Sequence, residues 1–337
     1  MIQSIVTCGD NVSSMLEFPA GSVDLVVTSP PFNCGKGYDA AGDSLTWDEY
    51  WDNTRRWVDG CVRVLGDGGR LAVNLPWWMG KKPRRDVPHQ FKTIAKASGL
   101  LFIDKVLWIK GDERNVHTSG GFGGGGCGWG TYLSPSGPAM RCASEPILIF
   151  AKGTRGRGRI DGTGRGSCVR GDITKEEWMA WTLDVWFIRG RSNRDHPAVF
   201  PAEIPRRLIK LYTFPGETVL DPHCGIGTTG VEAKSLGRSF IGIDISRAYC
   251  DIAEASILAA PPANGGSEPV DEESEDEPTT APTTSSRLLR NALLVGLTAG
   301  ALGLSSGYAA SYYMNRGTDT DTSVELGLGK AADYGIE

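Results

Sequence analysis

The sequence lacks several features that are typical of secreted or metal-binding proteins. Its eight cysteines include no C-x-x-C pair and lie singly, mostly in apolar or glycine-rich surroundings. This arrangement favours reduced, structural thiols over disulfides or zinc ligands, and no metal site is expected. The first ten residues, "MIQSIVTCGD", contain neither a charged leader nor a long apolar run. They argue against a secretory signal and predict a cytoplasmic protein.

The chain also lacks a strong overall charge, since its formal net charge is −5 over 337 residues. The charge is nevertheless unevenly distributed. Residues 261–337 contain 12 acidic and four basic side chains, which leaves residues 1–260 with a net charge of +3. A mildly basic body permits nucleic-acid binding without requiring it.

The last part of the chain contains two segments of unusual composition. Residues 261–286 are rich in Pro, Ser, Thr and acidic side chains, which predicts a solvated, disordered linker. In the tail that follows, residues 287–337, the stretch 292–313 carries no charge. Its length suits a membrane span, although Gly, Ser and Tyr dilute its hydropathy. Two interpretations stay open: a transmembrane or membrane-associated helix, or a small-residue helix that packs on a partner or on itself.

Short apolar runs rich in Val, Ile and Leu recur through residues 1–260. Several are too continuously apolar to have a solvent-exposed face, as in a parallel sheet that helices cover on both sides. Helical patterns alternate with them over residues 47–65, 201–213 and 229–237. We therefore expect one doubly wound, mostly parallel α/β domain. The expected strands are "SIVTC", "DLVVTS", "RLAVNL", "FIDKVLWI", "PILIFAK", "TVLDP" and "FIGIDI".

A glycine-rich turn follows one of these strands. In "TVLDPHCGIGTTG" a buried strand ends at Asp221 and a helix begins near Thr229. Such a turn exposes backbone N–H groups at a helix N-terminus, where negative or polar ligand groups bind. The spacing of its glycines matches a dinucleotide fingerprint, and Asp244, at the end of the next strand, could hold a ribose diol. A nucleoside cofactor is therefore expected, either a nicotinamide dinucleotide or S-adenosylmethionine.

The stretch "DLVVTSPPFN", residues 24–33, decides between these cofactors. It ends a second strand of the same sheet, so its polar tip lies at the carboxyl edge where α/β proteins bind ligands. Its two prolines stiffen the backbone and remove N–H donors, which leaves acceptors beside the ring of Phe32. A planar base with an exocyclic amine fits, because its N–H groups would meet the acceptors while its ring stacks. A nicotinamide enzyme has no use for this arrangement.

Together, "TSPPFN" and "LDPHCGIGTT" resemble the motifs of the amino-methylating DNA methyltransferases, which modify cytosine N4 or adenine N6. The order of the motifs is similar to that of the circularly permuted β group, and the resemblance covers about residues 4–256. It implies a doubly wound, mostly parallel seven-stranded sheet with an inserted target-recognition region. It also implies S-adenosylmethionine as cofactor and double-stranded DNA as substrate.

The resemblance implies a role for each matching position. Asp10 would approach the adenine amino group of the cofactor, Asp244 its ribose and Asp221 its methionine side. His223 replaces the Phe that is usual in the family, which removes an apolar contact near the cofactor, and no second ligand at suitable spacing makes it a metal site. The implied cofactor-binding residues are Asp10, Phe200, Pro201, Asp221, Cys224, Gly225, Gly227, Thr228, Thr229 and Asp244. The implied catalytic residues are Ser29, Pro30, Pro31, Phe32 and Asn33.

Target recognition would fall to residues 111–196, which we interpret as an insertion around one strand of the core. The insertion contains a long glycine-rich loop and then a basic run. Arginine can bind phosphate groups or read guanine, although a solvated flexible loop is the alternative. The candidate DNA-binding residues are Arg155, Arg157, Arg159, Arg165, Arg170 and Arg191.

The implied reaction is direct transfer, in which the amine nitrogen attacks the sulfonium methyl group in line. No cysteine lies within the pocket motif, which argues against methylation at carbon 5 of cytosine. Ser29 and Phe32 favour cytosine N4 over adenine N6, while Asn33 also fits adenine enzymes. Methylation of RNA or of protein glutamine ranks below both.

A hypothesis of a different class is a catalytically inactive relative that binds DNA or is tethered to a membrane. A cognate restriction endonuclease and a membrane contact through residues 292–313 stay open as partners. The oligomeric state also stays open.

Overall fold

The computed structural model describes residues 3–38, 43–79, 85–111, 133–138, 142–155, 171–190 and 200–261. The segments 262–286 and 287–337, including the apolar stretch 292–313, lie outside the described residues. Within the described ranges, no helix has both the length and the apolar character that a membrane span requires.

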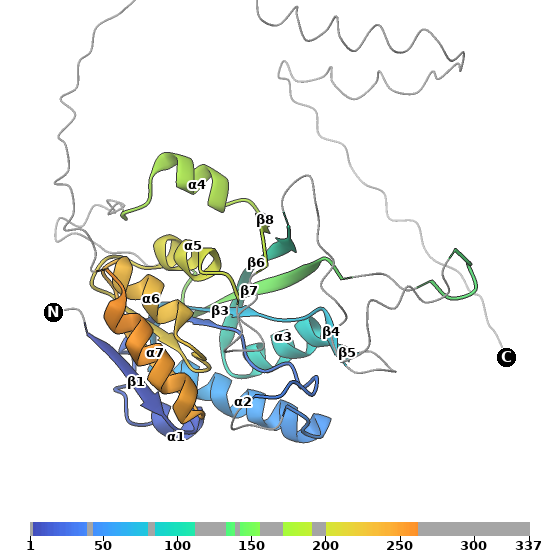
Figure 1. Ribbon diagram of the computed structural model, residues 1–337, viewed down its shortest axis with the longest axis horizontal. Helices are drawn as coiled ribbons and strands as arrows, with labels where there is room; N and C mark the ends of the chain where they lie inside the picture. Colours follow the sequence, from blue (N-terminus) through green and yellow to red (C-terminus); the bar gives the residue numbers. More distant parts are fainter. Residues whose placement is uncertain are drawn as a thin grey trace, which may run out of the picture. The chain divides into compact units, whose positions relative to one another are not determined.

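The described part of the chain alternates strands and helices, as expected (Figure 1). The strands are β1 (Ser4–Cys8), β2 (Val23–Thr28), β3 (Leu65–Asn74), β4 (Trp78–Met79), β5 (Arg85–Asp86), β6 (Leu100–Lys110), β7 (Ser144–Lys152), β8 (Val185–Ile188), β9 (Thr218–Asp221) and β10 (Ser239–Asp244). The helices are α1 (Asn11–Met15), α2 (Trp47–Val64), α3 (Val87–Ala97), α4 (Lys175–Trp181), α5 (Glu203–Tyr212), α6 (Thr228–Ser235) and α7 (Arg247–Ala259). All seven expected strands and all three expected helices are present.

The main sheet has the order β1-β10-β9-β2-β3-β7-β6-β8. Its strands are parallel except β7, which runs antiparallel to both β3 and β6. The strand β9, near the end of the domain in sequence, lies between β10 and β2. Its partner β2 comes from the beginning of the chain. This placement brings the two motif-bearing strands side by side.

The predicted fold class is confirmed, but the sheet contains eight strands where we expected seven. The additional strand, β8, pairs with β6 in parallel and lies within the insertion at residues 111–196. It is only four residues long and has one buried face, formed by Trp186 and Ile188. An alternation of buried and more exposed residues over only four positions is too short to predict a strand from the sequence.

Helices cover both faces of the sheet (Figure 1). On one face, α2 and α3 pack on strand residues such as Val26 and Leu71. On the other face, α5, α6 and α7 pack on residues such as Leu25 and Val27. Neighbouring residues of β2 therefore enter different cores, because successive side chains of a strand point to opposite faces. A strand buried on both sides needs the continuous apolar run that the sequence shows.

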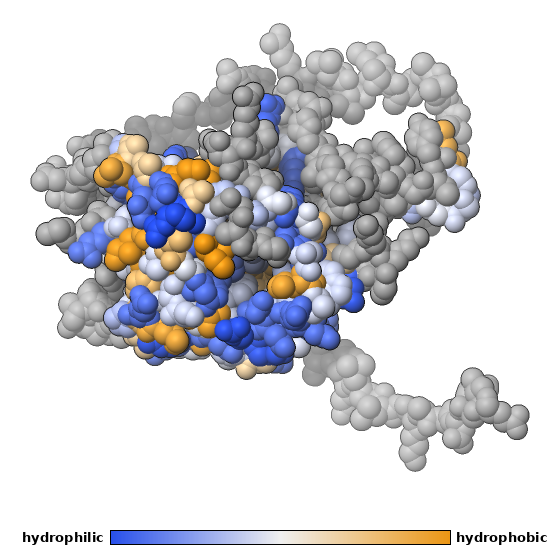
Figure 2. Space-filling view, turned by 60° about the horizontal axis from the view of Figure 1, so that its bottom comes forward, coloured by the Kyte–Doolittle hydropathy of each residue, from blue (hydrophilic) through white to orange (hydrophobic). Residues whose placement is uncertain are grey.

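The helix α2 leads from the candidate base pocket into β3. A capping box between Thr46 and Glu49 satisfies its first backbone N–H groups. One face of the helix, including Trp57 and Val58, is buried in the core. Figure 2 turns this side of the molecule forward and shows hydrophilic and hydrophobic residues interspersed over the described surface. The helix ends where Leu65 begins β3, so the glycines of "GDGG" lie within the strand rather than in a separate loop.

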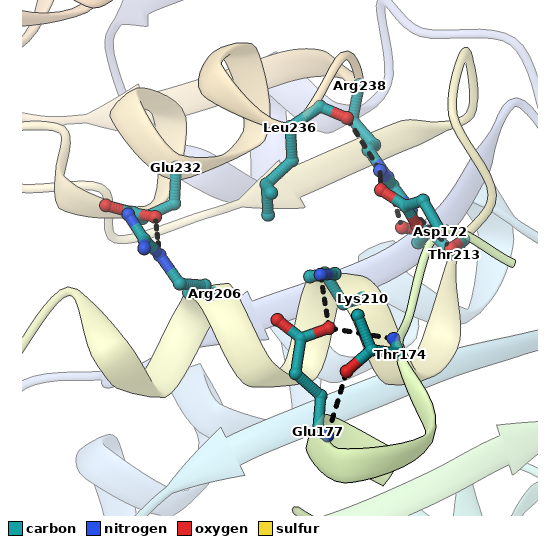
Figure 3. A network of polar contacts seen from close by, with 9 residues as sticks. All are labelled: Asp172, Thr174, Glu177, Arg206, Lys210, Thr213, Glu232, Leu236 and Arg238. Atoms are coloured by element: carbon teal, nitrogen blue, oxygen red, sulfur yellow. Dashed lines mark hydrogen bonds and ion pairs between the residues drawn. The ribbon is translucent and has the colours of Figure 1, made fainter. Parts of the chain in front are cut away.

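Ion pairs attach the segment 171–190, which carries α4 and β8, to the core (Figure 3). Arg238 is fully buried and donates to both carboxylate oxygens of Asp172, at 2.6 and 2.7 Å. It also donates to Thr213 Oγ1 and to the carbonyl groups of Thr213 and Leu236. All five guanidinium N–H groups are thereby used. Burial alone would raise the pKa of Asp172, but the hydrogen bonds and charge of Arg238 hold it below its ordinary value.

Candidate active site

The carboxyl ends of β1, β10, β9 and β2 surround a pocket of about 300 Å³. The strand order reverses between β9 and β2, since β10 and β1 lie to one side and β3 to the other. Pockets of doubly wound proteins form at such switch points. Among the predicted residues, the pocket is lined by Asp10, Ser29, Pro30, Pro31, Phe32, Asn33, Phe200, Cys224, Gly225, Thr228 and Asp244. The two motifs therefore meet in one cavity.

Four predicted cofactor residues do not line this pocket: Pro201, Asp221, Gly227 and Thr229. Asp221 is 1% exposed and accepts hydrogen bonds from Thr229 Oγ1 at 2.7 Å and from the backbone N–H of His223 at 3.1 Å. Burial raises its pKa to about 6, although these bonds act in the opposite direction. Asp221 therefore stabilises the turn through these hydrogen bonds and does not line the pocket.

The glycines of the turn make room for its unusual path. Gly225 and Gly227 have φ of 49° and 83°, in the left-handed region that suits glycine. A Cβ at Gly227 would lie 2.9 Å from Ala253 Cα, and one at Gly230 would lie 2.5 Å from Phe240 Cε1. These glycines let α6 approach α7 and β10 closely and leave the backbone of the turn facing the pocket.

Two carboxylates at neighbouring strand ends line the pocket. Asp244 Oδ2 accepts the N–H of Gly225 at 2.9 Å, and its Oδ1 accepts the N–H of Ser246 at 3.0 Å. Asp10 caps α1 through Ser13, whose N–H and hydroxyl group both donate to Asp10 Oδ2. Partial burial works against ionisation of Asp10, but the bonds from Ser13 lower its pKa. Both carboxylates are thus held in fixed positions with acceptor capacity left over.

In the candidate base pocket, Phe32 is half-buried against the core beside α2. Tyr50 donates its hydroxyl group to the carbonyl of Pro31 at 2.9 Å, so this carbonyl is already occupied. Asn33 has φ of 52°, and its amide bonds both backbone groups of Leu45, at 2.7 and 2.9 Å. Asn33 therefore borders the pocket but uses its side chain to fix the following loop. The predicted acceptors that remain are Ser29 and the Pro30 carbonyl.

Behind Ser29 lies a polar chain that sequence reasoning missed. Asn74, at the end of β3, donates to Ser29 Oγ at 3.5 Å and to Glu145 Oε2 at 2.8 Å. Glu145 in turn forms an ion pair with Lys110. Asn74 and Glu145 are both buried. No local pattern marks these residues, because β3, β6 and β7 bring them together only in the folded sheet.

His223 lines the pocket beside Trp57, with the two rings edge to face at 5.1 Å between centroids. Burial lowers its pKa to about 3, so the imidazole is neutral. Asn11 Nδ2 donates to His223 Nε2 at 2.9 Å, which leaves the proton on Nδ1 to face Thr28 Oγ1 at 3.1 Å. The residue that replaces the family's Phe is therefore hydrogen-bonded on both sides of its ring.

The remaining predicted residues give less information. Of the six candidate arginines only Arg155 lies within the described residues, where its side chain is exposed. Its carbonyl accepts a hydrogen bond from Arg70. Within the described ranges, no three His, Cys, Asp or Glu side chains are grouped as metal ligands would be.

Comparisons with known proteins agree with this geometry. The sequence model of the DNA methylase family matches residues 23–255. The chain belongs to the DNA methylase family. The predicted resemblance, and the predicted enzyme class of a DNA methyltransferase that depends on S-adenosylmethionine, are thereby confirmed.

Individual relatives agree with this assignment. The type II methyltransferase M.BglII of Bacillus subtilis is 28% identical over 268 residues, which cover 76% of this chain and 69% of that protein. The type II methyltransferase M.MjaVI of Methanocaldococcus jannaschii is 29% identical over 180 residues, which cover 53% of this chain and 84% of that protein.

Solved structures share the fold. The PvuII DNA methyltransferase, described as cytosine-N4-specific, has a TM-score of 0.58 at 20% identity, covering 79% of this chain and 88% of that one. TTHA0409 of Thermus thermophilus, in complex with S-adenosyl-L-methionine, has a TM-score of 0.57 at 23% identity, covering 77% of this chain and 95% of that one.

Proposed function

We propose that this DNA methylase transfers a methyl group to the exocyclic amine of a base flipped out of double-stranded DNA, with cytosine N4 as the preferred target. The main support for the proposal is that Ser29 and Phe32 line the same pocket as Gly225 and Asp244. One motif presents hydrogen-bond acceptors beside an aromatic ring, and the other presents a nucleoside-binding turn. A donor and an acceptor of the methyl group can therefore lie side by side.

The pocket residues fit S-adenosylmethionine. Asp244 has carboxylate oxygens with spare acceptor capacity for a ribose diol, and Asp10 offers a second carboxylate one strand away. The left-handed glycines open space for the cofactor beside α6. When bound, the cofactor supplies an electrophilic methyl group on a positively charged sulfur, which suits a pocket lined by carboxylates.

The residues of this chain then position the target amine. Ser29 Oγ and the Pro30 carbonyl accept hydrogen bonds from the N–H groups of this amine. These bonds orient the nitrogen lone pair toward the methyl group. Phe32 stacks on the base and offsets part of the cost of unstacking it from the duplex. The transfer would form the N–CH₃ bond and break the S–CH₃ bond, with S-adenosylhomocysteine as the leaving group. The proton released by the amine would pass to water through the acceptors at the Ser29–Pro30 edge. Positioning and fixed dipoles contribute most of the rate acceleration.

The preference for cytosine rests on Ser29 at the first position of the pocket motif, and adenine N6 is the alternative. Nucleoside analysis by mass spectrometry of host DNA, after expression of the full chain, distinguishes the two. N4-methylcytosine supports the preference, and N6-methyladenine overturns it while leaving the reaction class intact. The absence of both marks, with folded protein present, contradicts DNA methylation.

Variants of the base pocket test the division of roles. Ser29→Ala and Phe32→Ala should lower turnover by about tenfold or more, since each removes an interaction with the reacting base, while S-adenosylmethionine binding persists. Calorimetry measures cofactor binding, and methyl transfer to DNA measures turnover. Full activity of Phe32→Ala would show that the ring does not stack on the base.

The type II methyltransferases among its relatives support a role in a restriction-modification system, with a cognate endonuclease as the biological partner. For DNA contact the candidates remain the arginines of the insertion, of which Arg155 is exposed. Replacing Arg155 with Ala should weaken binding to all DNA sequences equally and reduce its salt dependence, as expected for a phosphate contact.

A further inference from the structure

The pocket contains a further carboxylate, Asp43, which takes no part in the proposed transfer. It lines the cavity beside the base motif and is only 5% exposed. Its Oδ2 accepts the N–H groups of Cys34 at 3.0 Å and Lys36 at 3.1 Å, and the Cys34 thiol at 3.4 Å. Its own carbonyl accepts the N–H of Gly35 at 2.7 Å. Residues 34–36, directly after the base motif, are therefore hydrogen-bonded to Asp43.

The other carboxylate oxygen, Asp43 Oδ1, is buried and has no hydrogen-bond partner among the residues that the structure describes. A buried acceptor left without a donor destabilises the folded state, and more so when it carries charge. Native proteins rarely leave such a group unpaired unless a water, an ion or a ligand completes it. The described hydrogen bonds of the carboxylate all go to Oδ2, so Oδ1 is the oxygen with which a bound molecule can pair.

The electrostatics of the pocket show what kind of molecule this oxygen suits. Among the described lining residues, Asp10, Asp43 and Asp244 carry carboxylates and Arg56 carries a guanidinium. Burial raises the pKa of Asp10 and the hydrogen bonds from Ser13 lower it. The charge of Arg56 lowers this pKa further, by a smaller effect. Burial and the charge of Asp43 together raise the pKa of the Cys34 thiol to about 11. With three carboxylates and one guanidinium in its lining, the pocket favours an N–H donor over an anion.

The position of Asp43 is also rigid. Asn33 binds both backbone groups of Leu45, which closes the loop on the far side of Asp43. An acceptor that is fixed before binding loses little entropy when the ligand arrives. Asp43 is thus held in place at the wall of the pocket before a ligand binds.

We propose that Asp43 Oδ1 accepts a hydrogen bond from an N–H group of a bound reactant, and so determines how that reactant lies in the pocket. This inference rests on the proposed function, because the donor is a group of one of its two reactants. The donor is either the α-ammonium group of S-adenosylmethionine or the exocyclic amine of the target base. Both are N–H donors, and the experiment below distinguishes them.

Asp43→Asn is the informative variant. Its amide oxygen can replace Oδ2 and keep the N–H groups of Cys34 and Lys36 satisfied, while its NH₂ group replaces Oδ1. An acceptor becomes a donor at the proposed contact with the ligand, and the carboxylate is replaced by a neutral amide. Asp86→Asn is the matched control, since Asp86 is an exposed helix cap of α3 bonded to the N–H of His89.

Calorimetry on the full chain compares S-adenosylhomocysteine, which has the α-ammonium group, with 5′-methylthioadenosine, which lacks the amino-acid part. If Asp43 binds the ammonium group, Asp43→Asn weakens S-adenosylhomocysteine by about tenfold or more and leaves 5′-methylthioadenosine unchanged. If Asp43 binds the target amine, both affinities stay unchanged, and single-turnover methyl transfer at saturating cofactor slows by about tenfold or more. Asp86→Asn should alter none of these quantities.

Two results overturn the proposal. One is unchanged binding and unchanged transfer in Asp43→Asn. The other is an equal loss of affinity for both ligands, which shows that Asp43 only holds the loop. The proposed function fails separately, if the wild-type chain binds neither S-adenosylhomocysteine nor S-adenosylmethionine.

Discussion

The buried pair of Arg238 and Asp172 should be among the most stabilising polar contacts of this fold, and its two ends should respond differently to mutation. Arg238 is fully buried, whereas the side chain of Asp172 is 33% exposed. When Arg238→Met removes the guanidinium, Asp172 can recover part of its solvation from water. When Asp172→Ala removes the carboxylate, Arg238 keeps an uncompensated charge inside the protein.

Breaking a buried ion pair costs about 3–5 kcal/mol, because the remaining charge is not solvated. We expect Arg238→Met at the lower end of this range, about 3 kcal/mol, and Asp172→Ala at the upper end, about 5 kcal/mol. The double variant should cost less than the sum, since neither charge is then left alone. Urea unfolding followed by circular dichroism measures all three free energies of unfolding.

The surface pair Arg55–Asp52 is the control, with side chains 52% and 72% exposed. Asp52→Ala should cost less than about 1 kcal/mol. Acid provides a second check. Because the folded pKa of Asp172 lies below its ordinary value of 3.8, the pair stabilises the protein fully above that pH and less as the pH falls through the folded pKa. A cost below about 1 kcal/mol for Asp172→Ala, or strict additivity in the double variant, would refute this reasoning.

Three further predictions concern the pocket and its support. Gly230→Ala should destabilise the protein by about 1–3 kcal/mol in urea unfolding, because its Cβ would meet Phe240; an unchanged midpoint would contradict the close approach. His223→Gln should flatten the loss of stability on acidification between pH 6.5 and about 3, where unfolding of the wild type takes up a proton at this site. The opposing contribution of Asp221, whose pKa is raised, is common to both proteins, so identical pH profiles would exclude a neutral His223. Tyr50→Phe should slow methyl transfer more than it weakens cofactor binding, because the Pro31 carbonyl of the base motif loses its donor; a selective loss of cofactor binding would contradict this assignment.

The fold was largely predictable because its strongest signals are local. The strand β2 enters both cores and must be continuously apolar, so "DLVVTS" could be recognised without any partner. The turn after β9 needs glycine at Gly225 and Gly227 for its left-handed backbone, and these residues also mark it in the sequence. A left-handed backbone position favours glycine wherever it occurs, so it can be recognised in the sequence.

The finer division of roles within the site was not predictable in the same way. Asn33 belongs to the base motif, yet its amide binds Leu45, which lies 12 residues further along the chain. His223 acquires its properties from burial and from Thr28 of β2, and Asp43 from burial and from Cys34 and Lys36 of its own loop. Spacing alone shows neither arrangement. The role of β8 also depends on tertiary context, because its pairing with β6 buries Trp186 in the core.

The insertion of β9 between β10 and β2 has a consequence for how the enzyme comes into being. During synthesis the first strands are made long before β9, so β2 has one unpaired edge until residues near 220 are available. Contacts between such distant parts of a chain form late and make folding slow. A nascent chain that stops short of β9 and β10 would hold a base pocket without the turn that faces it. Methylation competence therefore requires β9 and β10, the last strands of the domain to be synthesised, which lie between β1 and β2 in the sheet.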